Sequence, residues 1–186
     1  MKKWCIAMGC VLCLCAVIFW CGRIYSVNAA HTSEMVTYDV GETVDLEGIE
    51  IKCVEAHIFS VDEYKKNFNV GSVDVLYPND KLLCACINVK NTGDTALGWS
   101  DVIDGMCQGF QSVTWGSAAD PFATQSVNVF TSDDLAPGAD QDIWFTTMLS
   151  NIAFSRHTWE HLDEEEFYFV PVLEPVQIQM KLDVQK

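Results

Sequence analysis

Basic residues are scarce in this chain, which has 11 lysines and arginines against 26 aspartates and glutamates among its 186 residues. After residue 30 the imbalance grows, because 26 acidic residues then meet 8 basic ones and the formal net charge is −18. Such a field repels nucleic acid and anionic lipid headgroups, so we exclude nucleic acid as a partner. Solubility, a cationic partner and divalent cations remain as explanations of the acidity.

Signatures of common enzyme classes are also missing. The sequence has no G-x-S-x-G turn, and its glycines lack the spacing of a P-loop or of a dinucleotide-binding loop. Carboxylates cluster at 101–104 and 133–142, where they could hold calcium or solvate loops, but neither stretch fits the EF-hand loop. We therefore predict a protein that is not an enzyme and that needs no cofactor.

Formal charge is absent from a run of 19 residues, Trp4 to Gly22. As a helix with ~1.5 Å rise per residue this run is ~28 Å long, close to the hydrocarbon thickness of a bilayer. Two lysines precede it and only Arg23 follows closely, so the positive-inside rule keeps the N-terminus in the cytoplasm and exports the rest. We predict a membrane anchor in residues 1–30; cleavage after Ala29, which would secrete the remainder, is the alternative.

Residues 31–186 have the length of one domain, predicted to lie outside the cytoplasm. Five of the nine cysteines precede it, and four belong to it: Cys53, Cys84, Cys86 and Cys107. In an oxidising compartment these four could form up to two disulfides, with three possible pairings. A bridge from Cys84 to Cys86 is disfavoured, because residues i and i+2 of a strand point the same way.

Long amphipathic helices are missing after residue 30, and strand-like alternation takes their place. Residues 176–184, 83–89 and 143–149 each alternate apolar with polar side chains, and a turn at Glu47-Gly48 separates two further strands. The residues expected to face the core are Val176, Ile178, Met180, Leu182 and Val184, then Leu83, Ala85, Ile87 and Val89, then Ile143, Phe145, Thr147 and Leu149.

Weaker strand patterns occupy residues 110–115, 125–130 and 165–173, and short helical patterns occupy 61–68 and 155–162. We predict an all-β fold, an antiparallel immunoglobulin-like β-sandwich with one or two short helices, preceded by a single N-terminal transmembrane helix.

Three loose motifs add a resemblance. They are G-E-x-V at 41–44, V-x-N-x-G at 89–93 and L-x-P-G at 135–138. In their order over residues 36 to 184 the chain resembles the telokin-like, immunoglobulin-like extracellular domains found behind a signal or anchor in Gram-positive bacteria, a family with no agreed catalytic residues. The resemblance implies a β-sandwich at the cell surface and carries over no site residue.

The stretch His157-x-x-Glu160-His161 matches the H-x-x-E-H pattern of zinc peptidases. On a helix the two imidazoles lie one turn apart, where they could hold zinc. Only 25 residues follow His161, and their clearest pattern is a strand, which leaves no room for the helix that supplies a third ligand. We interpret the stretch as a short surface helix, with a zinc-binding protein or zinc-dependent hydrolase using His157 and His161 as the alternative.

Large aromatic residues gather among glycines in residues 98–122, as in many binding surfaces for proteins or glycans. Core packing is the simpler explanation, and the candidates for binding are Trp99, Phe110, Trp115 and Phe122. Our leading hypothesis is a membrane-anchored, extracytoplasmic interaction module with a protein or glycan partner at the cell surface. A purely structural stalk is a third possibility.

Overall fold

The computed structural model describes residues 2–30, 34–71, 77, 79–106, 108–130 and 132–185. Two compact units are present, Met1–Glu34 and Met35–Lys186, and each is described by itself. Cys107 lies outside the described residues, so the structure does not address its pairing.

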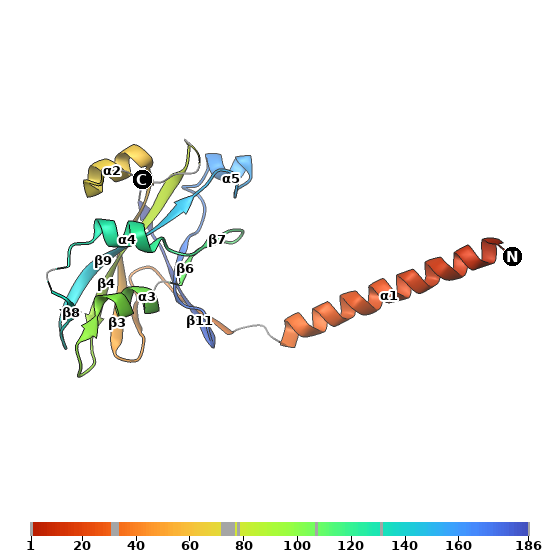
Figure 1. The fold of residues 1–186 in the computed structure, drawn as a ribbon, viewed down its shortest axis with the longest axis horizontal. Coiled ribbons are helices and arrows are strands. Elements are labelled where there is room, and N and C mark those ends of the chain that lie inside the picture. The colour runs from red at the N-terminus through yellow and green to blue at the C-terminus, as the bar shows by residue number, and fades with distance from the viewer. Residues whose placement is uncertain are drawn as a thin grey trace. The chain divides into compact units, whose positions relative to one another are not determined.

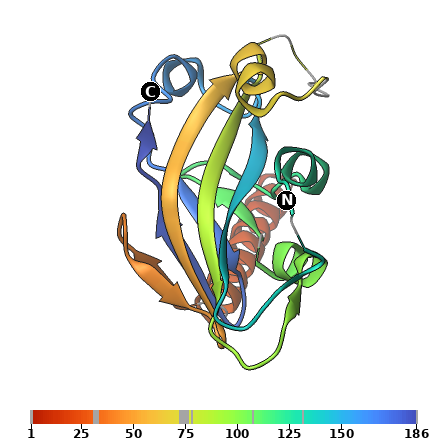
Figure 2. The same ribbon diagram turned by 90° about the vertical axis from the view of Figure 1, so that its left-hand side faces the viewer.

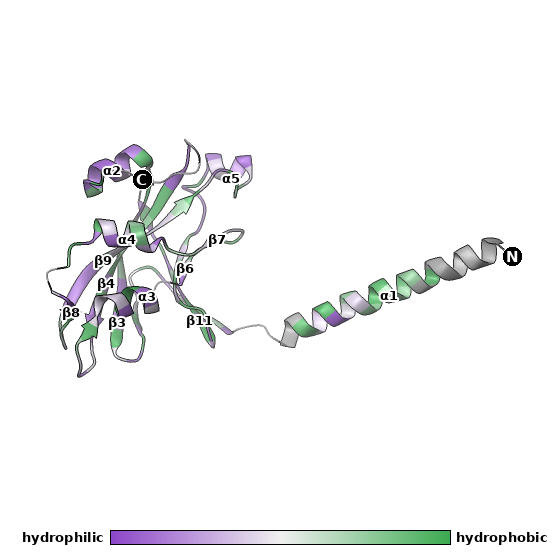
Figure 3. Ribbon diagram, viewed as in Figure 1, coloured by the Kyte–Doolittle hydropathy of each residue, from purple (hydrophilic) through white to green (hydrophobic). Residues whose placement is uncertain are grey.

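Helix α1 (Lys2–Ala30) accounts for most of the first unit (Figure 1). The described side chains, those of residues 11 and 13–27, are exposed, and many of them are apolar (Figure 3). Among the residues that the structure describes, no helix is long and apolar enough to cross a membrane. The side chains of residues 4–10 and 12, which belong to the predicted anchor, and of Ala29, the alternative cleavage point, lie outside the described ones.

The second unit is a β-sandwich, as predicted. Its first sheet has the strand order β12-β3-β4-β9, with β2 paired to β3. Figure 2 shows β3, β4 and β9 side by side as long orange, lime and cyan strands. The bounds are β2 (Thr43–Asp45), β3 (Ile49–Ser60), β4 (Lys81–Asn91), β9 (Asp140–Leu149) and β12 (Val184–Gln185). Strand β12 runs parallel to β3, so the sandwich is not wholly antiparallel.

The second sheet has the order β1-β11-β10-β6-β7. Its strands are β1 (Glu34–Tyr38), β6 (Gly109–Gln111), β7 (Gly116–Ser117), β10 (Tyr168–Val172) and β11 (Val176–Lys181). A separate two-stranded ladder joins β5 (Leu97–Gly98) to β8 (Asp134–Leu135).

The core lies between the two sheets. Phe145 of β9 and Phe169 of β10 meet there with ring centroids 5.1 Å apart, and both side chains are fully buried. The core-facing residues predicted for 83–89 and 143–149 are all buried, as expected. Cys84 and Cys86, which lie between them in β4, are buried as well, so burial does not alternate along this strand.

Strand β11 departs from the predicted alternation. Gln179 is buried next to buried Met180, because its side chain has polar partners across the sheet. It donates to Thr37 Oγ1 (2.7 Å) and accepts from the side-chain amide of Gln111. A polar residue can therefore occupy a buried position here without losing its hydrogen bonds.

The outer face of the first sheet is covered as well. Helix α2 (Val61–Phe68) follows β3 directly and, as predicted, fills residues 61–68. Its Tyr64 packs with Leu82 and Cys84 of β4 in a second apolar cluster, which buries β4 on both faces. Cys53, Cys84 and Cys86 are free thiols.

Two helices were not predicted. Helix α3 (Trp99–Met106) buries Trp99, Val102 and Met106, which recur at the spacing of one helix face. Helix α4 (Pro121–Val127) begins after Asp120, whose carboxylate accepts from the N–H groups of the first turn, and has proline at its first position. The strand predicted at 125–130 is therefore wrong.

Candidate functional site

The H-x-x-E-H stretch folds as the short helix α5 (Arg156–Glu160). Ser155 caps it by accepting from the Thr158 N–H. The rings of His157 and His161 stack with centroids 4.7 Å apart, and both are exposed.

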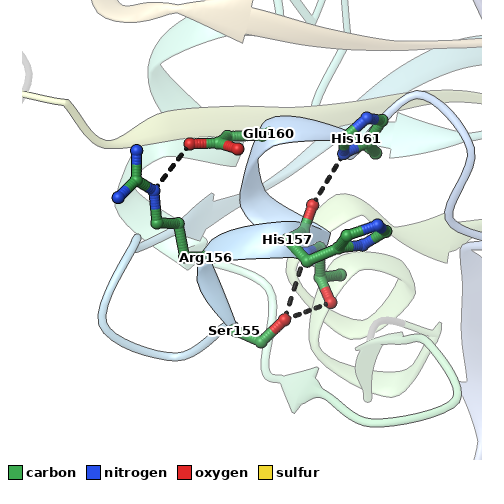
Figure 4. A network of polar contacts seen from close by, with 6 residues as sticks. Ser155, Arg156, His157, Glu160 and His161 are labelled. Atoms are coloured by element: carbon green, nitrogen blue, oxygen red, sulfur yellow. Dashed lines mark hydrogen bonds and ion pairs between the residues drawn. The ribbon is translucent and has the colours of Figure 1, made fainter.

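The third member of the motif faces elsewhere. The Glu160 carboxylate pairs with Arg156 Nε at 2.8 Å, and Figure 4 shows this pair on the side of the turn away from the imidazoles. His161 Nδ1 donates to the His157 carbonyl (2.9 Å), and this bond, with the nearby acids, raises the pKa of His161. Metal binding needs a neutral imidazole, so a raised pKa opposes it.

Within the described part of the chain, no group of three or more histidine, cysteine, aspartate or glutamate side chains is placed to hold a metal ion. The structure thus brings together two donors of the zinc hypothesis and does not add a third.

The four aromatic candidates do not form one surface. Trp99 and Phe110 are buried in the core, where Trp99 contacts Phe130 and Phe110 contacts Phe169. Trp115 is half-buried against Phe154. Phe122, at the start of α4, is 83% exposed, so among these four it alone presents most of its ring to solvent.

A pocket that was not predicted lies where the end of β3, the start of α2, the start of β4 and helix α5 come together. Figures 1 and 2 both show α2 and α5 at the same end of the long strands. Its volume is about 480 Å³, within the usual range for ligand sites. The lining residues are Ser60, Val61, Asp62, Asn79, Asp80, Lys81 and Trp159.

Local structure fixes the rim of this pocket. Ser60 ends β3 and caps α2 in a reciprocal capping box with Glu63. Lys81 begins β4 and pairs with Ser60 on one side and Leu149 on the other. The Lys81 ammonium lies 5.3 Å from the centroid of the Trp159 ring, within the range of a cation–π contact.

Asp80 is the most deeply buried charged residue of the pocket, with 2% of its surface exposed. Its Oδ2 accepts from the backbone N–H of Tyr77 (2.9 Å). Its Oδ1 is buried and has no hydrogen-bond partner. An unmatched buried carboxylate oxygen is costly, so this atom marks a place where a donor is missing.

A smaller pocket of about 280 Å³ also has Lys81 in its lining. Glu160 and Asp163 contribute to this lining, together with apolar residues that include Ile58 and Leu162. Both pockets that Lys81 lines therefore also contain acidic residues.

Sequence reasoning missed this site because its residues come from three separate stretches. Asn79, Asp80 and Lys81 precede the alternation at 83–89, and Trp159 belongs to the short helical pattern at 155–162. Neither pattern signals that the stretches meet.

A family model described as "Domain of unknown function (DUF5028)" matches residues 35–178. The chain belongs to this family. The part that matches DUF5028 begins in β1, ends in β11 and includes every residue that lines the larger pocket.

Two solved structures are similar to this DUF5028 chain. One is an uncharacterized beta-sandwich protein from Clostridium difficile 630, with 13% identity over 82% of this chain and 98% of that chain and a TM-score of 0.48. The other is a conserved hypothetical protein from Bacillus anthracis, with 10% identity over 76% of this chain and 94% of that chain and a TM-score of 0.49. No curated protein matches the chain.

Proposed function

We propose that the protein is an extracytoplasmic binding module, held at the membrane by its N-terminal segment, that takes a ligand in the larger pocket beside Trp159. One observation carries this proposal: a pocket of about 480 Å³ contains a buried carboxylate, Asp80, with one oxygen that has no partner. A bound ligand with a hydrogen-bond donor would supply the hydrogen bond that this oxygen lacks.

The protein, on this proposal, binds its ligand and does not catalyse a reaction. The support is the arrangement of α5, where Glu160 is engaged by Arg156 and cannot at the same time activate a water beside the two histidines. Two of the described thiols, Cys84 and Cys86, are poor nucleophiles, since burial raises the pKa of each to about 12.

The cellular location of the protein is proposed from the sequence. The uncharged run Trp4–Gly22 and the excess of positive charge before it support an anchor with the domain outside the cytoplasm. On intact cells we expect an added protease to cut the domain, whereas a domain protected until the cells are lysed would contradict the proposed orientation.

An immunoglobulin-like, telokin-like sandwich is the finer fold that we propose. Its support is the place of the three motifs: G-E-x-V enters β2, V-x-N-x-G ends β4, and L-x-P-G forms the turn before β9.

The binding function is tested with the full chain in a non-ionic detergent. Peptides and glycans released from the surface of the cells that carry the protein are screened for an increase in melting temperature, and each hit is then titrated by calorimetry. Pocket variants Trp159→Ala and Asn79→Ala are expected to weaken binding at least tenfold, while Asn88→Ala, on the outer face of β4 away from the pocket, leaves it unchanged. Hits that bind all variants equally would refute the pocket as the site.

A further inference from the structure

We infer that the larger pocket recognises a primary ammonium group, with Asp80 as its principal acceptor. The inference rests on the proposed binding function and adds the chemical class of the ligand. Its basis is a buried carboxyl oxygen, Asp80 Oδ1, that has no hydrogen-bond partner among the described residues.

The lysine next to Asp80 does not neutralise it. No ion pair within 4.0 Å joins Lys81 to a carboxylate among the described ion pairs, which are His57–Glu55, Arg156–Glu160 and Lys181–Glu166. The Lys81 ammonium lies over the Trp159 ring instead. Asp80, which is 2% exposed, therefore has no cationic partner among the described ion pairs, a costly arrangement for a buried carboxyl group that a ligand cation would relieve.

Two further orphan oxygens lie at the same end of the sheet. Lys81 pairs with Leu149, so Asp80 and Ser150 each lie one residue beyond the last pair of the β4–β9 ladder. Ser150 Oγ and Asn151 Oδ1 are buried and, like Asp80 Oδ1, have no hydrogen-bond partner among the described residues. Neither residue lines the larger pocket, so Asp80 is the orphan group that belongs to it.

Other charges act on a ligand in the pocket. Asp62, in the first turn of α2, adds a second carboxylate to the lining and favours a positive ligand. Lys81, whose ammonium lies over the Trp159 ring, lines the same pocket and opposes one. The formal charge of −18 after residue 30 attracts cationic ligands over a longer range.

A hard metal ion is the competing occupant, because the pocket offers carboxylate oxygens. Calcium takes six to eight oxygen ligands and usually several carboxylates. The described lining contains two carboxylates, Asp62 and Asp80. The pocket also has room for an organic ligand behind its charged group. These observations favour the ammonium group.

The test uses the full chain in detergent and the tripeptide glycyl-lysyl-glycine, blocked at both ends. The matched probe is the same peptide with an acetylated lysine side chain, which keeps the shape and removes the charge. Cadaverine separates a free diamine from a peptide as the source of the ammonium group. Binding is measured by calorimetry and by the change in melting temperature, with calcium chloride as a further arm.

We expect the lysine peptide or cadaverine to bind and the acetylated peptide to bind at least tenfold more weakly. Asp80→Asn should reduce the affinity at least tenfold, and Asp62→Asn should reduce it several-fold without affecting the fold. Asp94→Asn makes the same change of charge on an exposed turn beyond the opposite end of β4 and should leave binding intact. Lys81→Gln should tighten binding, because it removes a like charge from the pocket.

Equal binding of the two peptides, or no binding of any amine, would overturn the inference. Stabilisation by calcium that Asp80→Asn abolishes, without binding of amines, would overturn it in favour of a metal site. If amines fail while an uncharged surface ligand binds in a manner that depends on Trp159, the ligand class is wrong and the proposed binding function stands. If nothing binds through the pocket, both are wrong.

Discussion

Gly109 is a residue with no room for a side chain. It begins β6 with a backbone φ of +153°, and a Cβ placed on it would lie 2.4 Å from the carbonyl oxygen of Ser117 in β7. Because that oxygen belongs to the backbone, the hairpin itself would have to move.

Gly109→Ala is therefore expected to lower the free energy of unfolding by ~1–3 kcal/mol, measured by chemical denaturation. Gly105→Ala is the matched control, since a Cβ there meets nothing within 4 Å and the residue lies in helix α3. It should be neutral or stabilise by ~0.5–1 kcal/mol. Equal losses for the two variants would show that the close approach at Ser117 is not the cause.

The thiols of β4 are expected to be unreactive. Burial raises the pKa of Cys84 to about 12, and the Cys84 sulfur also accepts a weak hydrogen bond from Thr146 Oγ1. Because the thiolate is the nucleophile, iodoacetamide at pH 8 should leave Cys84 and Cys86 unmodified in the folded protein and label both in denaturant. Mass spectrometry of the tryptic peptides provides the measurement, and rapid labelling of the folded protein would contradict the buried placement.

At the scale of elements, the edge of the first sheet is closed by a side chain. Asn128, just after α4, imitates a strand: its amide donates to the Trp144 carbonyl (2.8 Å) and its oxygen accepts from the Trp144 N–H (2.8 Å). Two residues after Trp144 in β9, the Thr146 N–H donates to Thr124 Oγ1 (3.3 Å). Exposed strand edges template aggregation, and these contacts block that edge.

Asn128→Ala should lower the free energy of unfolding by ~1–3 kcal/mol, because it leaves both backbone groups of Trp144 without partners. It should also promote association, measured by light scattering below the melting temperature. Asn88→Ala removes an amide that bonds Asp140 and Asp142 on the exposed surface, and its effect should be much smaller. A comparable loss in both variants would argue against the edge-closing role.

The capping box of helix α2 predicts how protein stability depends on pH. The Ser60 hydroxyl and then the Ser60 backbone N–H stabilise the Glu63 carboxylate and lower its pKa. A carboxyl whose pKa is lower in the folded state stabilises the protein above its unfolded pKa, and this contribution is lost as the pH falls through the folded value. In Ser60→Ala the pKa of Glu63, followed by NMR titration, should rise toward its ordinary value; an unchanged pKa would contradict the capping box.

Elements with strong alternation could be predicted from the sequence. Strands β4 and β9 have regular alternation and clear turns beside them, and helix α2 has a capping serine and a glutamate three residues later. Helices α3 and α4 were not predicted. Helix α4 does carry a signal in the sequence, a capping Asp120 followed by proline, whereas α3 depends on packing by residues such as Trp99.

At the scale of the whole molecule, the larger pocket could not be predicted because no short motif contains it. Asp62, Asp80 and Trp159 are distant in the sequence, and pairing of β3 with β4 and of β4 with β9 is what brings them to one end of the sheet. The H-x-x-E-H motif, in contrast, was visible in the sequence but depends on a three-dimensional context that α5 does not provide.

The excess of acidic residues predicts that stability depends on salt. Repulsion among the charges of the domain acts over a Debye length of ~30 Å at 0.01 M salt and ~10 Å at 0.1 M. The melting temperature of the full chain in detergent should therefore rise by a few degrees when sodium chloride is raised over that range. Potassium chloride should act equally, and a melting temperature insensitive to both salts would contradict net repulsion.

The position of strand β1 in the second sheet determines where a pulling force on the N-terminus would act. This strand is the first after the N-terminal segment and, among the described strands, lies at the edge of the second sheet beside β11. If the chain is tethered by its N-terminus, tension from a captured ligand passes through these five residues before it reaches the core. Since β1 supplies Thr37 to the buried Gln179, a pull strong enough to peel it away would open that polar contact first and leave the remaining strands loaded but intact.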